Sequence, residues 1–150
     1  MKNVLTLLGF LALTAAAAAF GAQFVPGQWY AALTKPAWTP PNSVFGPVWS
    51  VLYLAIAVAG WLAWRSGKAK TALVFWGVGL ILNAAWSLLF FGQHLIGVAL
   101  LDIVLLLATI LGFVITAWPH ARLASILFLP YLAWVSYATA LNFALWRLNS

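Results

Sequence analysis

Residues 95–118 read LIGVALLDIVLLLATILGFVITAW, and Asp102 is the only charged side chain among them. A run of about 20 apolar residues is long enough for an α-helix to cross the hydrocarbon core of a bilayer. A strand of a membrane β-barrel is about half as long and alternates between apolar and polar residues. This stretch is continuously apolar, so it predicts a membrane-spanning helix.

Four further stretches have the same character, at residues 3–24, 44–64, 71–91 and 123–146. Hydrophobic residues make up 66% of the chain and charged residues 5%, whereas soluble domains are about half apolar and about a quarter charged. We therefore expect an all-α membrane protein, a five-transmembrane-helix bundle that forms one domain over residues 1–150. The first stretch, Ala-rich after Lys2, also has the features of a secretory signal peptide.

The connection between the first two stretches is long. Residues 25–43 read VPGQWYAALTKPAWTPPNS and are rich in proline and tryptophan. Long loops in compact proteins are often functional. Residues 28–34 are expected to form a short interfacial helix, followed by extended backbone because a residue before proline avoids the α region. Asn42 or Ser43 is expected to cap the second span.

The seven basic residues lie at the chain ends and in the connections, not in one patch. With five spans, one side of the membrane carries Lys2, Arg65, Lys68, Lys70 and Arg122, and the other carries Lys35 and Arg147. Cytoplasmic loops are enriched in Lys and Arg. This bias predicts a cytoplasmic N-terminus in a bacterial cell membrane and an external long loop. A basic nucleic-acid-binding surface is not indicated, and no nucleic-acid partner is expected.

The usual residue sets of enzymes are absent. The chain has no cysteine, two histidines and one carboxylate, so it offers no catalytic triad, carboxylate pair or iron–sulfur ligand set. His94 and His120 both fall between spans. We expect no metal site and no obligatory cofactor. Asp102 has two interpretations: a structural anion held by hydrogen bonds or by Arg147, or a group with a proton or ligand role, since ionisable groups within spans are often functional.

The chain is unusually rich in tryptophan, with ten such residues. Those near span ends fit an interfacial aromatic belt, and they are Trp61, Trp64, Trp76, Trp118 and Trp146. Deeper aromatic residues share helix faces with other candidate residues, in the sets Trp49 with Tyr53, Asn83 with Trp86 and Phe90, and Trp134 with Ala138 and Leu141. These faces either line a cavity for an apolar or aromatic ligand or simply pack the bundle.

Four motifs together carry a family resemblance. They are WY-x2-L-x-KP-x-W-x-PP at residues 29–41, GPVW-x2-LY at 46–53, N-x2-W-x3-FFG at 83–92 and PYLAW-x3-AT-x-LN at 130–142. In this order and spacing they resemble the TspO/MBR family, also called the translocator protein, tryptophan-rich sensory protein or peripheral-type benzodiazepine receptor family. The resemblance covers essentially the whole chain and points to a bacterial member. It implies that the first stretch is retained as a transmembrane helix.

The resemblance implies a cavity that opens near the long loop and binds porphyrins, notably protoporphyrin IX. It carries over the ligand-binding residues Tyr30, Trp38, Pro41, Phe45, Trp49, Asn83, Trp134, Ala138 and Leu141. The implied function is that of a tetrapyrrole-binding sensor, carrier or regulator in porphyrin metabolism and stress response.

Two alternatives stay open: light- and oxygen-dependent porphyrin degradation, with Trp49 and Trp134 as photochemical residues, and transport of porphyrin or sterol-like ligands. Catalytic activity is therefore uncertain, and binding alone is the preferred interpretation. A homodimer is also expected, because small residues allow helices to approach closely. Those residues are Ala55, Ala59, Ala63, Gly77 and Gly79, for which packing within one chain is the alternative.

The sequence departs from the family pattern at two places. Residues 141–147 correspond to the sterol-recognition segment of animal members but have Phe143 in place of its central tyrosine, although a reversed pattern occurs at Arg122, Phe128 and Leu132. Such sterol motifs are weak patterns, so sterol binding is in doubt. Val98 stands where animal members have a ligand-facing tryptophan, which predicts a smaller cavity wall there.

Overall fold

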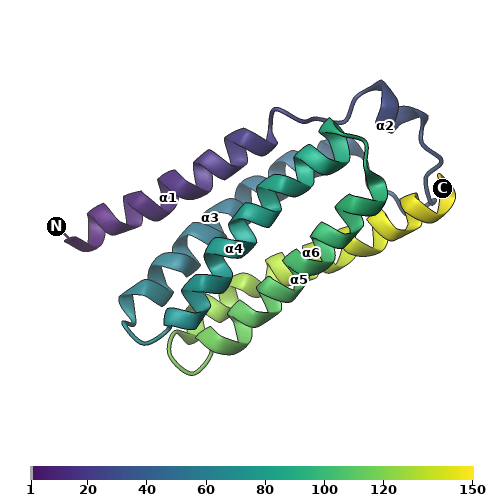
Figure 1. Ribbon diagram of the computed structural model, residues 1–150. Helices are drawn as coiled ribbons and strands as arrows, with labels where there is room; N and C mark the ends of the chain where they lie inside the picture. Colours follow the sequence, from purple (N-terminus) through teal and green to yellow (C-terminus); the bar gives the residue numbers. More distant parts are fainter. Residues whose placement is uncertain (1) are drawn as a thin grey trace.

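A computed structural model describes residues 2–150, and within them the chain forms helices joined by turns, without strands (Figure 1). The long helices are α1 (Lys2–Gly21), α3 (Phe45–Arg65), α4 (Lys70–Ser87), α5 (Ile96–Ala117) and α6 (Arg122–Leu148). They account for five segments that are long and apolar enough to cross a membrane. The predicted all-α membrane fold with five spans is confirmed.

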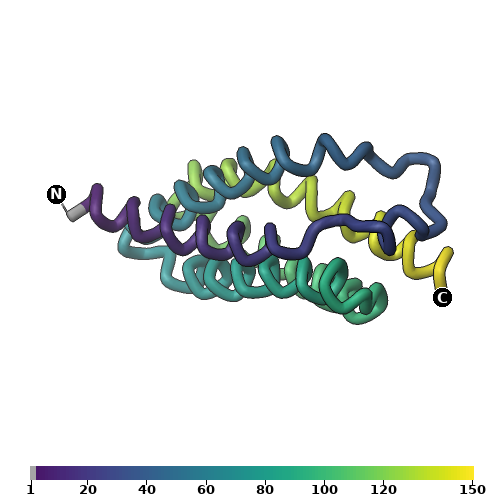
Figure 2. Tube along the Cα trace, turned by 90° about the horizontal axis from the view of Figure 1, so that it is seen from above, coloured from purple at the N-terminus to yellow at the C-terminus, as the bar shows by residue number. Residues whose placement is uncertain are grey.

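The five long helices form a closed ring. Around it, α1 packs against α3, α3 against α6, α6 against α5, α5 against α4, and α4 against α1. Figure 2 shows α1 between α3 on one side and α4 on the other. Only 6% of the α1 span is buried, against 22% to 33% of the other spans. The first helix is therefore the most loosely held member of the ring.

The first helix ends at Gly21, earlier than the predicted end at residue 24. Residues 22–27 are irregular, and Phe24 packs against the end of α4, where a Cβ on Gly92 would lie 2.8 Å from the Phe24 ring. That end is a π-helical turn, η2 (Leu88–Gly92). Such turns are rare in proteins, and many of those that occur lie at functional sites.

The connection from α1 to α3 contains the short helix α2 (Gln28–Ala32) and a 3-10 turn, η1 (Asn42–Val44). The predicted Asn42 or Ser43 cap on α3 is wrong. The 3-10 turn leads directly into α3, which begins at Phe45 and has no side-chain cap hydrogen bond.

Two side chains hold this connection in place: Tyr137 of α6 and Asn149, which follows α6. The Thr34 N–H donates to Asn149 Oδ1 at 2.9 Å, and Asn149 Nδ2 donates back to the Thr34 carbonyl at 3.0 Å. The Tyr137 hydroxyl donates to the Trp38 carbonyl at 2.6 Å. The connection is thereby held against the C-terminal end of α6.

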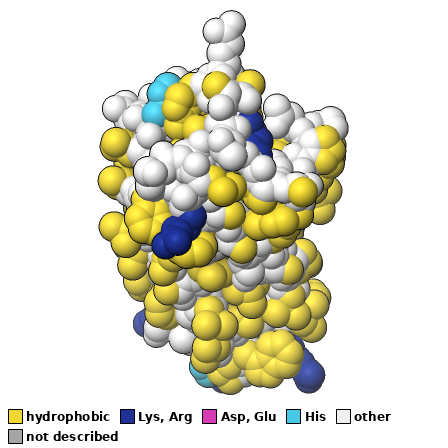
Figure 3. All heavy atoms as spheres, turned by 90° about the vertical axis from the view of Figure 1, so that its right-hand side faces the viewer, with side chains coloured by type: hydrophobic (Ala, Val, Ile, Leu, Met, Phe, Trp, Pro, Cys, Tyr) yellow, Lys and Arg dark blue, Asp and Glu magenta, His cyan; other side chains and the backbone are white. Residues whose placement is uncertain are grey.

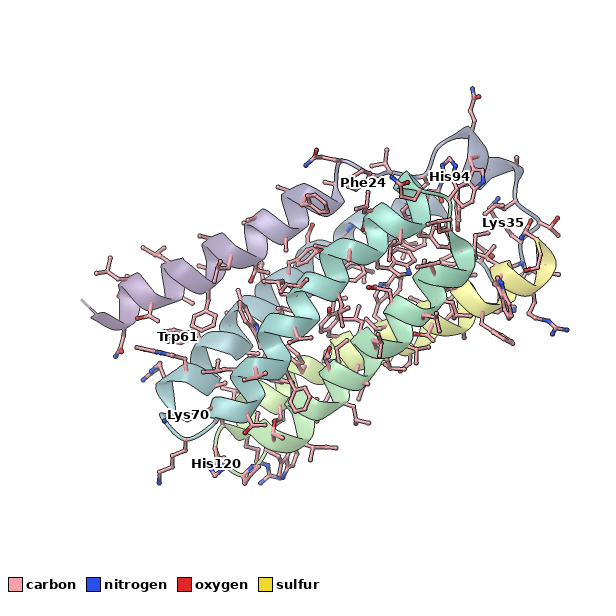
Figure 4. All side chains as sticks on the ribbon, viewed as in Figure 1. Phe24, Lys35, Trp61, Lys70, His94 and His120 are labelled. Carbon is pink, nitrogen blue, oxygen red and sulfur yellow. The ribbon has the colours of Figure 1, made fainter. Side chains whose placement is uncertain are left out.

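The two ends of the bundle carry the residues that the five-span order assigned to them. Lys70, His120 and Trp61 lie at one end, and Lys35 and His94 lie at the other (Figure 4). No acidic side chain is visible on the face shown in Figure 3, in keeping with the burial of Asp102.

The predicted aromatic belt needs one correction. Trp64, Trp118 and Trp146 are well exposed, but Trp76 is buried. Its indole Nε1 donates to the Ile56 carbonyl at 2.8 Å, and its ring packs edge-on against Phe10. Trp76 is therefore a core residue, because the helix face it occupies points into the α1–α3–α4 contact.

Candidate ligand cavity

A cavity of about 400 Å³ lies within the ring, in the half of the bundle nearer the long connection. All five long helices contribute to its wall. The α1 end and the chain after it supply Ala18, Gly21, Ala22, Phe24, Val25 and Pro26; the other segments supply Asn42, Phe45, Gly46, Trp49, Tyr53, Asn83, Trp86, Ser87, Phe91, Ile103, Leu106, Trp134, Val135 and Ala138. The wall is predominantly apolar and aromatic, as is usual for small-molecule sites.

Five of the residues predicted for the site meet in this wall: Phe45, Trp49, Asn83, Trp134 and Ala138. The Phe45 and Trp134 rings make an edge-to-face contact with centroids 5.9 Å apart, which joins α3 to α6. Trp49 packs against Tyr53 at 5.4 Å. Aromatic side chains predicted from separate motifs therefore surround one space.

None of the three residues predicted from the long connection, Tyr30, Trp38 and Pro41, lines the cavity. Tyr30 is buried against Phe90 and Phe91, with the Lys35 ammonium 4.8 Å from its ring centre. Burial, together with the nearby Tyr137, raises the pKa of the Tyr30 hydroxyl. Tyr30 thus anchors α2 to the end of α4 as a neutral side chain.

Trp38, Pro41 and Leu141 also lie outside the wall. Trp38 is 48% exposed and packs edge-on against Tyr137, and Pro41 is exposed. Leu141 shares the helix face of Trp134 but lies seven residues further along α6, a distance of about 10 Å at the α-helical rise. It is buried beyond the cavity, in the cluster that contains Phe90.

Sequence reasoning missed several wall residues. Tyr53 and Trp86 were not among the predicted site residues, although they share helix faces with Trp49 and Asn83, and that shared face could have identified them. Ala18, Gly21 and Ala22 gave no signal, because small apolar residues are common on any face of a spanning helix. Val98 is 47% exposed and does not line the cavity, so the smaller wall expected there is not found.

A chain of polar groups crosses the apolar wall. The Tyr53 hydroxyl donates to Asn83 Oδ1 at 2.7 Å, and Asn83 Nδ2 donates to the Tyr131 hydroxyl at 3.0 Å. Asn83 is 5% exposed and Tyr131 3%. Unpaired polar groups are costly in an apolar interior, so this chain fixes α3, α4 and α6 relative to one another beside the cavity.

A second polar connection orients Trp86. Its indole Nε1 donates to Asn142 Oδ1 at 3.0 Å, and Asn142 Nδ2 donates to the Ile96 carbonyl at 3.0 Å. The Trp86 ring stacks on Phe90, with centroids 4.9 Å apart and an angle of 20° between the planes. The hydrogen bonds and the stacking leave Trp86 one orientation, with part of its surface in the cavity wall.

Asp102 lies on α5, next to the wall residue Ile103, and is 8% exposed. Its Oδ2 atom is buried and has no hydrogen-bond partner among the described residues. The ion pair with Arg147 considered from the sequence is not formed in the described part of the chain. The structural interpretation based on that pair therefore has no support.

A ring of five spanning helices around an apolar, tryptophan-rich cavity defines an integral, multi-pass membrane protein. The sequence profile of the TspO/MBR family matches residues 8–147. The chain is 40% identical to the tryptophan-rich protein TspO of Archaeoglobus fulgidus over an alignment of 154 positions, covering 100% of this chain and 98% of the relative.

Two other relatives agree. The human translocator protein is 39% identical over 137 residues, covering 86% of this chain and 81% of the relative. The tryptophan-rich sensory protein of Cereibacter sphaeroides is 36% identical over 145 residues, covering 95% and 90%. The chain belongs to the TspO/MBR family, and the resemblance seen in the four motifs is confirmed.

Proposed function

We propose that the protein binds a tetrapyrrole, with protoporphyrin IX as the representative ligand, and acts as a sensor, carrier or regulator of such molecules. The observation that carries this proposal is the apolar cavity of about 400 Å³ with Trp49, Trp86 and Trp134 in its wall. A flat aromatic macrocycle suits such a wall, because each aromatic contact contributes about 0.5–1.5 kcal/mol beyond burial. The names of two relatives, sensory protein and translocator protein, support a role in sensing or carrying.

A titration tests this proposal. Protoporphyrin IX added to the purified protein should quench tryptophan fluorescence saturably. The double variant Trp49→Phe/Trp134→Phe should bind about 2- to 12-fold more weakly, because smaller rings lose about 0.5–1.5 kcal/mol of contact. The double variant Trp64→Phe/Trp118→Phe changes two exposed rings outside the cavity and should bind normally. Equal weakening in both double variants would contradict the proposed site.

Photo-oxidative degradation of the bound porphyrin is the second candidate. It is favoured by the position of Trp49 and Trp134, which both border the cavity, because indoles can donate electrons to an excited ring or react with singlet oxygen. Illumination of the porphyrin complex with and without oxygen separates the two functions. If the protein only binds, the porphyrin absorbance is lost at the same rate as for free porphyrin. If the protein degrades porphyrin, the absorbance is lost faster than for free porphyrin when oxygen is present, and this acceleration is smaller in the Trp49→Phe/Trp134→Phe variant.

We also propose that the chain lies in a bacterial cell membrane with its N-terminus in the cytoplasm. The support is the charge bias. Arg65 ends α3, Lys68 follows it, and Lys70 and Arg122 begin α4 and α6, at the bundle end where Figure 4 shows Lys70 and where Figure 1 marks the N-terminus. With five spans the C-terminus is external. A C-terminal alkaline phosphatase fusion should therefore be active, and an inactive fusion would reverse the assignment.

A homodimer remains part of the proposal, with a smaller contact surface than the sequence indicated. Ala59 and Ala63 are buried within the chain, and a Cβ on Gly79 would lie 2.9 Å from the Thr109 hydroxyl oxygen. Gly77 has open space beside it and permits close approach of a second helix. Native mass spectrometry in mild detergent should show a dimer that Gly77→Leu weakens; a monomer before the substitution would refute this.

A further inference from the structure

The seam between α1 and α4 separates the cavity from an apolar groove on the outside of the bundle. On the inner side, α1 contributes Ala18, Gly21 and Ala22 to the cavity, and α4 contributes Asn83, Trp86 and Ser87. On the outer side, the same two helices form an apolar groove, lined by Ala17, Phe20, Leu80, Ile81, Ala84, Ala85 and Leu88. The cavity and the groove are thus backed by interleaved residues of the same two helix segments.

The outer groove faces the lipid. Ile81 is 71% exposed and Phe20 40%, and both belong to helices that cross the membrane. The groove lining has no charged side chain and no polar side chain. A hydrophobic molecule dissolved in the bilayer can therefore occupy the groove without desolvating any polar group.

Little holds the seam closed. Gly21 faces Ser87 across the seam, and a Cβ on Gly21 would lie 3.2 Å from the Ser87 hydroxyl oxygen. Within residues 17–22 and 80–88, no side-chain hydrogen bond joins the two helices. Gly21 is also the last residue of α1, and the chain after it is irregular. The C-terminal end of α1 can thus move away from α4 while the contacts among α3, α4, α5 and α6 stay intact.

The route past the long connection is better secured. The connection is tied to the C-terminal end of the chain by both Thr34–Asn149 hydrogen bonds and by the Tyr137–Trp38 hydrogen bond. Passage of a large ring on that side requires these contacts to break, whereas passage at the seam requires only the separation of apolar and small side chains.

We propose that the α1–α4 seam is a lateral portal, through which a hydrophobic aromatic ligand passes between the bilayer and the cavity. This inference rests on the proposed function, because it assumes that the cavity holds such a ligand. The ligand first binds in the outer groove, and the C-terminal end of α1 then moves away from α4 to let it pass.

A disulfide across the seam tests the portal. The chain has no native cysteine, so an introduced pair cannot form a disulfide with another residue of the same chain. In Gly21→Cys/Ser87→Cys the two Cβ positions lie 3.6 Å apart, within the usual disulfide range of about 3.5–4.5 Å. The matched control Gly79→Cys/Thr109→Cys has Cβ positions 3.7 Å apart and joins α4 to α5 away from the seam. Association and dissociation rates of protoporphyrin IX are measured before and after oxidation, with disulfide formation verified by mass.

Oxidation of the seam pair should slow both rates about tenfold or more, because binding that requires a blocked conformational change is slow. The dissociation constants of its reduced and oxidised forms should agree within about twofold, since a barrier alters both rates equally. The control disulfide should change neither rate. Unchanged rates in the fully oxidised seam variant, or equal slowing in the control, would overturn the portal.

Two further variants do not depend on disulfide formation. Ala84→Phe fills the outer groove without touching the cavity wall, and should slow both rates while the dissociation constant stays the same. Asn149→Ala loosens the connection and should leave both rates unchanged; faster rates would place the route there and reject the portal. Absence of porphyrin binding to the unaltered protein would contradict the proposed function itself, whereas binding with unaltered rates in Ala84→Phe would contradict only the portal.

Discussion

Replacing Ala138 with threonine is expected to weaken porphyrin binding by roughly 1–3 kcal/mol, or about 5- to 150-fold in Kd. Ala138 lines the cavity one helical turn from Trp134. A β-branched side chain at this position projects extra volume into the space that the ligand needs. The thermal stability of the ligand-free protein should change little, because the added atoms enter a cavity.

Titrations of the two alanine variants of α6 check this expectation. Ala140→Thr makes the same chemical change on an exposed face of the helix and should bind porphyrin normally. Unchanged affinity in Ala138→Thr would remove Ala138 from the site. Lower affinity in both variants would assign the effect to the helix and not to the cavity.

Replacing Asn142 with leucine is expected to have the largest effect on folding. The two side chains have the same number of heavy atoms and the same branching, but leucine leaves the Trp86 indole N–H without its acceptor and removes the side-chain donor to the Ile96 carbonyl. Asn142 is 1% exposed, so water cannot replace it. Each buried polar group left unpaired costs about 1–3 kcal/mol. Porphyrin affinity should fall as well, because Trp86 loses the contact that orients it.

Unfolding of detergent-solubilised protein provides the measurement, with Asn149→Leu as the matched control. Asn149 also makes hydrogen bonds, but it is exposed near the C-terminus, so water replaces the lost partner. We expect a much larger loss of unfolding free energy for Asn142→Leu than for Asn149→Leu. Equal losses would mean that the buried bonds to Trp86 and Ile96 contribute no special stability.

The spans could be predicted because a bilayer imposes a minimum length on a continuous apolar helix, and each stretch meets it. Helix faces grouped Trp49 with Tyr53, Asn83 with Trp86, and Trp134 with Ala138, and all six residues border the cavity. The faces alone did not separate a cavity wall from bundle packing, and the family resemblance selected Trp49, Asn83 and Trp134 as site residues. Periodicity gives the direction of a side chain around the helix but not its position along the helix relative to the cavity. It therefore could not show that Leu141 lies beyond the cavity.

The conformation of the long connection could not be predicted in the same way. Trp38 and Thr34 are placed by Tyr137 and Asn149, which are about a hundred residues away in the sequence. The contribution of α1 to the wall was equally hidden, because Ala18 and Gly21 act by being small. Their role appears only when the neighbouring helix is present.

The proposed recognition of the ligand rests on aromatic contact in an apolar cavity, without coordination of a metal. His94 lies at one end of the bundle, stacked on Trp29 with ring centres 4.0 Å apart, and His120 lies at the other end. Neither histidine belongs to the cavity wall. A ring held only by aromatic contacts gains little from bound iron.

The deciding measurement is the ratio of dissociation constants for haem and metal-free protoporphyrin on the purified protein. We expect metal-free protoporphyrin to bind at least as tightly as haem, and Trp49→Phe/Trp134→Phe to weaken both by the same factor. Haem binding more than about tenfold tighter, a preference of about 1.4 kcal/mol, that is lost in His94→Ala or His120→Ala would show that the ligand is held by coordination.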